Sequence, residues 1–130
     1  MSLISKSLTD LRCTFNSYET YGKLIFTYYD DKGKERVTID LKSDVADKNI
    51  ELKKEDFLAL SRLVTKRLNL ELTIGIYQKI YYNDQNKSIN IVDGDDDYPS
   101  YEDYFYSFIL TNDKLTELDK ILINFLNYMK

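Results

Sequence analysis

Polar and apolar residues alternate in residues 36–42, "RVTIDLK", and the polar ones could bind a charged ligand. The apolar residues share one face of a predicted strand, which leaves Arg36, Thr38 and Lys42 on the polar face. Basic residues on a strand can follow a phosphate backbone, and aromatic rings beside them stack on bases for about 1–3 kcal/mol per base. The pattern therefore indicates the chemistry of a surface that binds single-stranded nucleic acid.

A second such face lies in residues 70–82, "LELTIGIYQKIYY". Tyr77, Lys79 and Tyr81 share the parity opposite the isoleucines, so they are predicted to face solvent. A tyrosine in a strand more often packs on its neighbours than binds a ligand, and this alternative stays open for each of them. With two residues of 23–29, "KLIFTYY", the predicted nucleic-acid-binding residues are Lys23, Tyr29, Arg36, Thr38, Lys42, Tyr77, Lys79 and Tyr81.

The absence of histidine and the single cysteine argue against several kinds of chemistry. Histidine is the commonest general base and transition-metal ligand, so its absence disfavours Ser-His-Asp hydrolysis and zinc sites. Cys13 has no histidine to activate it, and it is predicted to be a small buried apolar residue. The sequence thus predicts a protein that is not an enzyme and that has no cofactor and no metal.

Acidic residues gather in one stretch, residues 93–106, "DGDDDYPSYEDYFY". It holds six acids and no base, so the net charge of −4 becomes +2 without it. A solvated loop is the plain interpretation, and a calcium loop is disfavoured because tyrosine stands where such a loop needs glycine. The sharper alternative is a protein-binding inhibitor, a phage-encoded DNA mimic or immunity-type protein that binds a basic protein partner. Its predicted partner-binding residues are Asp95, Asp96, Asp97, Tyr98 and Tyr101.

Periodic patterns assign these residues to elements. After a short polar lead, strands are predicted for residues 12–19, 23–29, 36–42, 49–52, 87–92 and 103–110. Residues 70–82 are predicted to form one long strand bent at Gly75. Apolar residues at helical spacing predict helices near residues 54–68 and 112–129.

The two halves of the chain are alike in their apolar positions. Residues 49–69 and 107–127 align without gaps at an offset of 58, and two tyrosine hairpins, "YYDDKGKERVTID" and "YYNDQNKSINIVD", align at an offset of 53. The sequence predicts one domain, 1–130, with internal repeat units at about 12–69 and 70–130. The predicted fold class is α+β, two antiparallel β-meanders, each with a C-terminal helix, packed as one domain.

The segments "NIELKKEDFLALSRLV" and "FILTNDKLTELDKILINFL", each after several predicted strands, resemble the single-stranded DNA-binding fold of the positive-cofactor-four coactivators. Two such units in one chain resemble the Whirly proteins, and the resemblance covers nearly the whole sequence. It implies a Whirly-like fold in which two sheets present aromatic and basic side chains to single-stranded DNA with low sequence specificity. It also implies helices that pair in the core.

Further expectations concern the cellular location and the source of the protein. The single cysteine, with no apolar run long enough for a membrane helix or signal peptide, predicts a cytoplasmic protein. Usage rich in lysine, asparagine, isoleucine and tyrosine suits an AT-rich bacterium or one of its phages. The sequence leaves open DNA against RNA, the identity of a protein partner and the formation of a homo-oligomer.

Overall fold

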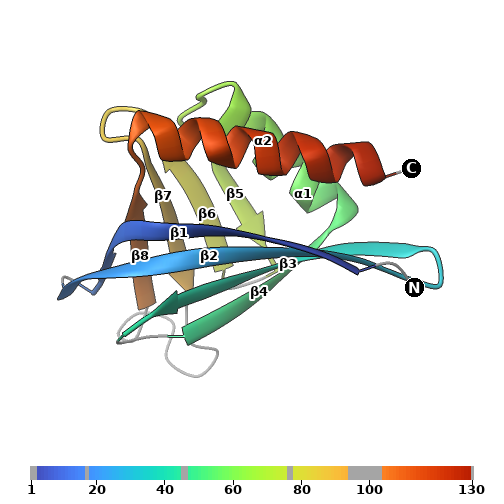
Figure 1. The fold of residues 1–130 in the computed structure, drawn as a ribbon, viewed down its shortest axis with the longest axis horizontal. Coiled ribbons are helices and arrows are strands. Elements are labelled where there is room, and N and C mark those ends of the chain that lie inside the picture. Colours follow the sequence, from blue (N-terminus) through green and yellow to red (C-terminus); the bar gives the residue numbers. More distant parts are fainter. Residues whose placement is uncertain (1–2, 17, 45–46, 76–77, 94–103, 130) are drawn as a thin grey trace.

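The structure is a computed structural model that describes residues 3–16, 18–44, 47–75, 78–93 and 104–129. These residues form one sheet of eight antiparallel strands and two helices (Figure 1). In this part of the chain, no helix is long and apolar enough to cross a membrane.

The first four strands form a meander that leads into the first helix. They are β1 (Leu3–Phe15), β2 (Tyr18–Asp31), β3 (Lys34–Ser43) and β4 (Asp47–Lys53), followed by α1 (Lys54–Thr65). Each strand pairs with the next in antiparallel register. In β3 the three apolar residues, Val37, Ile39 and Leu41, are buried, which confirms the predicted alternation.

The last four strands form a second meander, followed by the second helix. They are β5 (Glu71–Ile74), β6 (Gln78–Asn83), β7 (Ser88–Asp93) and β8 (Tyr104–Ile109), followed by α2 (Asn112–Tyr128). The Thr111 side chain accepts a hydrogen bond from the Lys114 backbone N–H and caps α2. Because β8 pairs with β1, the strand order is β4-β3-β2-β1-β8-β7-β6-β5.

The predicted Whirly-like fold class is wrong. Strands account for 59% of the structure and helices for 26%, and the strands pair as one continuous, nearly closed, barrel-like sheet instead of two repeat units. The strand that joins the two meanders, β1, begins in the segment predicted to be a polar lead. Its alternation is interrupted by a bulge between Leu8 and Leu11, where Asp10 has a φ of 56°. The extra residue breaks the alternation of polar and apolar residues, so the sequence pattern did not indicate the first part of this strand.

Two further predictions of strands are wrong for a similar local reason. Residues 12–19 contain the turn between β1 and β2, where Asn16 has a φ of 47°. In residues 70–82, predicted to be one bent strand, β5 and β6 instead pair with each other in antiparallel register, and Leu72 lies opposite Ile80. Gly75, with a φ of 64°, begins the turn of this hairpin. In each segment one residue with positive φ interrupts a stretch that is otherwise rich in strand-forming residues.

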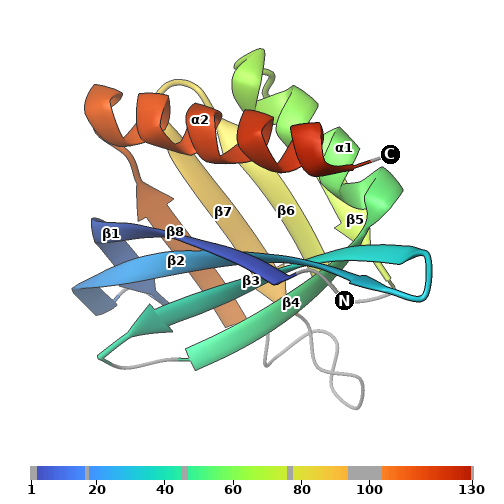
Figure 2. The same cartoon turned by 45° about the vertical axis from the view of Figure 1, so that its right-hand side comes forward.

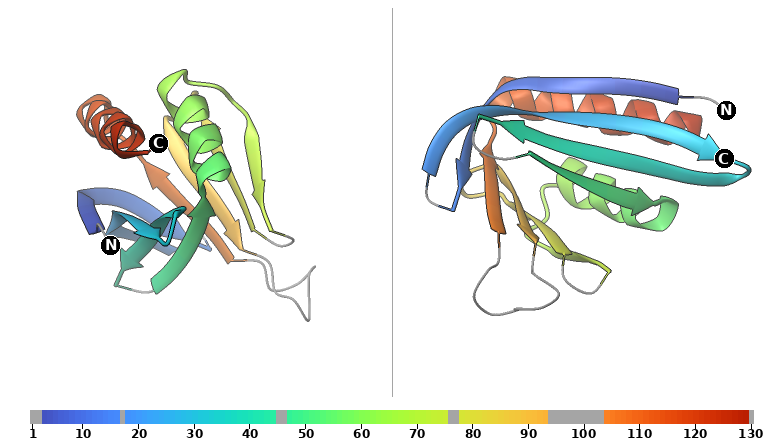
Figure 3. Two further views of the ribbon diagram at one scale, coloured as in Figure 1. Left: turned by 90° about the vertical axis from the view of Figure 1, so that its right-hand side faces the viewer. Right: turned by 90° about the horizontal axis from the view of Figure 1, so that it is seen from below.

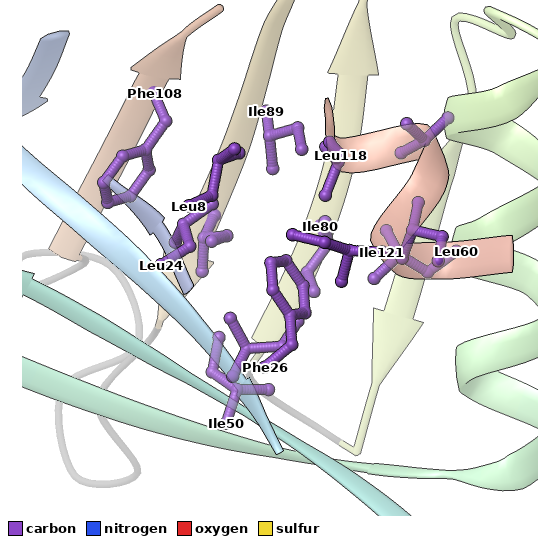
Figure 4. Close-up of a cluster of buried hydrophobic side chains, with 14 of the residues drawn as sticks. Leu8, Leu24, Phe26, Ile50, Leu60, Ile80, Ile89, Phe108, Leu118 and Ile121 are labelled. Atoms are coloured by element: carbon purple, nitrogen blue, oxygen red, sulfur yellow. The ribbon is translucent and has the colours of Figure 1, made fainter. Parts of the chain in front are cut away.

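The hydrophobic core lies on the inner side of the curved sheet, where both helices pack (Figures 2 and 3). Figure 4 shows how Leu24, Ile80, Leu60 and Leu118 converge from two distant strands and from the two helices. The apolar residues leave a cavity of only about 10 Å³ among them. That is about the room that a single water molecule needs, so this part of the interior has no space for a small-molecule ligand.

Both helices begin where the sequence predicts and bury the predicted apolar face, but α1 ends at Thr65, three residues before the predicted end. The residues aligned at the offset of 58 are buried in pairs, such as Phe57 with Leu115 and Leu60 with Leu118. The pattern therefore identified core positions correctly in both halves, although the strands before the helices belong to one sheet.

Two ion pairs join elements that are far apart in the sequence. The guanidinium of Arg67, just after α1, makes hydrogen bonds of 2.9 and 2.8 Å with the two carboxylate oxygens of Asp119 in α2. Lys48 of β4 forms an ion pair with Asp93 of β7, whose side chain is buried. This second contact connects the edge strand β4 to the other meander and helps to close the barrel.

Candidate nucleic-acid interface

Five of the predicted residues lie on the outer face of the β2–β3 hairpin. Antiparallel pairing places Tyr29 opposite Arg36 and Lys23 opposite Lys42, with Thr38 between these pairs along β3. All five alternate with buried residues, so their side chains are on the face away from the core. The structure therefore brings these predicted residues together on one surface.

At one end of this surface the charges are neutralised within the sheet. The Tyr29 hydroxyl donates a hydrogen bond of 3.1 Å to Glu51, and the Arg36 guanidinium lies 3.4 Å from the same carboxylate. Partial burial and then the hydrogen bond to Glu51 raise the pKa of Tyr29, so its hydroxyl remains neutral. Tyr29 and Arg36 thus already have a partner, and this end of the surface offers little free positive charge.

At the other end, two lysines face each other across the strands. Lys23 of β2 and Lys42 of β3 are direct cross-strand partners, and like charges in that position destabilise a sheet. Lys42 has an exposed ion pair of 3.3 Å with Asp47, whereas Lys23 has no ion-pair partner among the described residues. The arrangement leaves positive charge that an anion could neutralise.

A groove of about 450 Å³ opens beside this lysine pair. It is lined by Thr9, Asp10, Tyr21, Gly22, Lys23, Lys42, Ser43 and Asp44. The β1 bulge forms one side of the groove, because Thr9 and Asp10 together stand opposite the single residue Lys23 of β2. Tyr21 has the same strand parity as Lys23, and the residue is 69% exposed. The groove thus combines an exposed aromatic ring with two ammonium groups.

Gly22 is needed for the close approach of the strands at this groove. A Cβ atom on Gly22 would lie 2.5 Å from the backbone oxygen of Lys42, which is too close for any other residue without movement of the backbone. The glycine therefore lets β2 and β3 come together directly behind the lysine pair.

The predicted residues of the second half lie on a different part of the sheet. Lys79 and Tyr81 face outward from β6, and β1, β8 and β7 separate this strand from β2. Lys79 lies 3.1 Å from the carboxylate of Glu71, and the Tyr81 ring packs 6.5 Å from Phe105. The two faces are not brought together into one site. Tyr77 lies outside the described residues.

The residues of the alternative, acidic site also lie outside the described residues. They are Asp95, Asp96, Asp97, Tyr98 and Tyr101. Within the part of the chain that the structure does describe, no group of histidine, cysteine and carboxylate side chains could hold a metal ion. Cys13 is buried, as predicted, and burial raises the pKa of its thiol to about 11.

Two important parts of the groove, Tyr21 and Asp10, are not among the residues predicted to bind nucleic acid. Tyr21 lies two residues before Lys23, so strand parity alone would have placed it on the same face. Asp10 belongs to a strand that was predicted to be a polar lead, and no local pattern indicates its bulge. The chain matches no family model, no curated protein and no solved structure.

Proposed function

We propose that the protein is a non-enzymatic nucleic-acid-binding protein that prefers single-stranded DNA and has low sequence specificity. The groove beside Lys23 and Lys42 is the centre of the proposed interface, and the outer face of the β2–β3 hairpin continues it. The observation that carries the proposal is the direct opposition of two lysines next to an exposed tyrosine.

The charge arrangement supports this proposal on energetic grounds. A pair of like charges on neighbouring strands lowers stability slightly, and a bound phosphate between the two ammonium groups would reverse that cost. Tyr21 supplies a ring on which a base can stack without sequence preference. The net charge of −4 opposes binding at long range, so the contact of a phosphate with the two ammonium groups has to outweigh the carboxylates of Asp10 and Asp44 in the same groove.

The test is a fluorescence-anisotropy titration with a labelled oligothymidine at two salt concentrations. The wild type should bind more weakly at high salt, because binding releases counterions from the phosphates. Lys23→Ala with Lys42→Ala should reduce the slope of log affinity against log salt by about 1.4, about 0.7 for each lost contact to a single strand. The double variant should be as stable as the wild type or slightly more stable, because the repulsion is removed.

The matched control is Lys79→Ala with Lys87→Ala on the β6–β7 hairpin, which removes the same charge from residues that do not line the groove. It should leave the salt slope unchanged. No binding at low salt would contradict the proposed function, and equal losses in the two double variants would contradict the assignment to this groove.

The cytoplasmic location belongs to the same proposal. Buried Cys13 with its raised thiol pKa suits a cysteine that stays reduced and unreactive. Fractionation of cells that express the protein, followed by detection in the soluble fraction, would test this location.

A further inference from the structure

We propose that the groove beside Lys23 and Lys42 is a subsite for a single nucleotide that prefers guanine. This inference rests on the proposed function and adds a base preference to it. The groove lies on one face with the lysine pair and carries three kinds of group that can contact a nucleotide: an aromatic ring, two ammonium groups and two carboxylates.

The two carboxylates are the part of the groove that nucleic-acid affinity alone does not explain. Asp10 and Asp44 would repel a phosphate, so a surface that only followed the backbone would be better without them. Neither has a hydrogen-bond or ion-pair partner among the described residues, although two lysines line the same groove. Lys42 instead pairs with Asp47, outside the groove. Both carboxylates are therefore available to accept hydrogen bonds from a ligand.

A bulge places Asp10 in the groove in an unusual conformation. Its φ of 56° lies in the left-handed region, which aspartate and asparagine tolerate better than most residues. Bulges of this kind redirect a side chain out of the regular alternation. Tyr21, on the neighbouring strand, presents an exposed ring to the same groove.

The donor pattern of guanine fits these acceptors best. Its Watson–Crick edge has two adjacent donors, N1–H and the N2 amino group, and one carboxylate can accept both at once. Adenine and cytosine place a lone-pair nitrogen beside their amino group, and thymine has a single N–H between two carbonyls. A carboxylate repels those acceptors, so guanine should bind best and thymine worst. The base would stack on Tyr21, with its phosphate between Lys23 and Lys42.

The experiment compares a short oligothymidine with the same oligonucleotide that carries one central guanine, both measured by anisotropy at one salt concentration. The ratio of the two affinities is the result, because changes in the net charge of the protein cancel in it. We expect the guanine to increase affinity about fivefold or more in the wild type, as for one good two-bond contact to a base. The ratio should fall toward one in Asp10→Asn with Asp44→Asn, because an amide offers thymine a donor and an acceptor.

The single variants Asp10→Asn and Asp44→Asn then show which carboxylate reads the base. Asp31→Asn, on the exposed end of β2, is the matched control and should keep the wild-type ratio. Asparagine has the shape of aspartate and tolerates the left-handed conformation, and circular dichroism checks that each variant is folded.

The outcomes separate this inference from the proposed function. Salt-sensitive binding with equal affinity for both oligonucleotides would overturn the guanine subsite and leave the proposed function in place. A guanine preference that persists in the double aspartate variant would also overturn it, because the carboxylates would not be its source. Absence of binding to either oligonucleotide would overturn both.

Discussion

The β2–β3 and β6–β7 hairpins both carry a pair of adjacent tyrosines near the end of their first strand, but the two pairs face the core in opposite order. In the first hairpin Tyr28 faces the core and Tyr29 faces outward, whereas in the second Tyr81 faces outward and Tyr82 faces the core. The alignment at an offset of 53 therefore matches an inward tyrosine with an outward one. A shift of one residue in the alignment exchanges the two faces of a strand. The apolar pattern alone therefore does not show which tyrosine of each pair faces the core.

The turns of the two hairpins explain this difference. Lys32 and Gly33, both with positive φ, form the two-residue turn of the first hairpin, and Asp31 pairs with Lys34 beside it. In the second hairpin, four residues separate the last pair, Asn83 with Ser88. Strand β2 extends two residues beyond its tyrosine pair, but β6 extends only one residue beyond its own. The two similar hairpin sequences therefore have different strand registers relative to their turns.

The inward tyrosines have similar environments in both hairpins. The Tyr28 hydroxyl donates a hydrogen bond of 2.7 Å to Glu35, and the Tyr82 hydroxyl donates one of 2.8 Å to Asp84. The outward tyrosines differ, since Tyr29 bonds to Glu51, whereas Tyr81 packs on Phe105. The inward tyrosines of the two hairpins are therefore equivalent in their contacts, whereas the outward tyrosines are not.

Alanine substitution of the four tyrosines gives the largest expected effects. Tyr28→Ala and Tyr82→Ala should each lower the free energy of unfolding by about 3–5 kcal/mol, because each leaves a cavity in the core. Tyr29→Ala and Tyr81→Ala should each cost about 1 kcal/mol, as residues on the outer face. Urea unfolding followed by circular dichroism measures all four. A loss from Tyr81→Ala as large as that from Tyr82→Ala would show that the assigned faces are wrong.

Binding should distinguish the two outer faces. Tyr21→Ala should weaken single-stranded DNA binding by about 1–3 kcal/mol, the contribution of one stacked base. Tyr81→Ala should leave the affinity nearly unchanged, because Tyr81 packs on Phe105 on a distant part of the sheet. Anisotropy at low salt measures both. The reverse order of losses would move the interface to the β6–β7 hairpin.

The free energy of unfolding should fall at alkaline pH because of the two inward tyrosines, Tyr28 and Tyr82. Burial and then a carboxylate hydrogen bond raise the pKa of Tyr28 and of Tyr82 from 10 to about 12. Because the unfolded chain ionises at the lower pKa, this stability is complete below pH 10 and is lost as the pH rises toward 12. Urea unfolding at several alkaline pH values measures the loss.

Phenylalanine variants identify the groups responsible for that loss. Tyr28→Phe with Tyr82→Phe should make the free energy of unfolding less dependent on pH in this window. Tyr29→Phe with Tyr81→Phe is the control on the outer face and should retain more of the dependence. An unchanged alkaline loss in the inward double variant would contradict the assignment.

The smallest expected effect concerns the exposed ion pair between Lys79 and Glu71. Half of each side chain is accessible to solvent, so Lys79→Ala should change the free energy of unfolding by about 0.5 kcal/mol or less. A similar result is expected at high salt, because solvent already screens the pair. A loss of more than about 1 kcal/mol would show that this outer face contributes to stability in a way that exposed ion pairs do not.

Much of the local structure was predictable from the sequence. Alternation identified β3 and its outer residues Arg36, Thr38 and Lys42, and helical periodicity identified both helices with their buried residues. These predictions succeeded because side-chain parity and helical spacing depend only on neighbouring residues. The β5–β6 hairpin was missed because one glycine, Gly75, can mark either a bend or a turn.

The sequence by itself determined which residues are apolar, where helices begin, and that Lys42 belongs to the polar face of its strand. Only the tertiary structure decided that β1 joins the two meanders into one sheet, because pairing of strands distant in sequence leaves no local signal. The same holds for the groove. Its bulge, its lysine pair and Tyr21 meet through cross-strand register, which depends on the whole sheet.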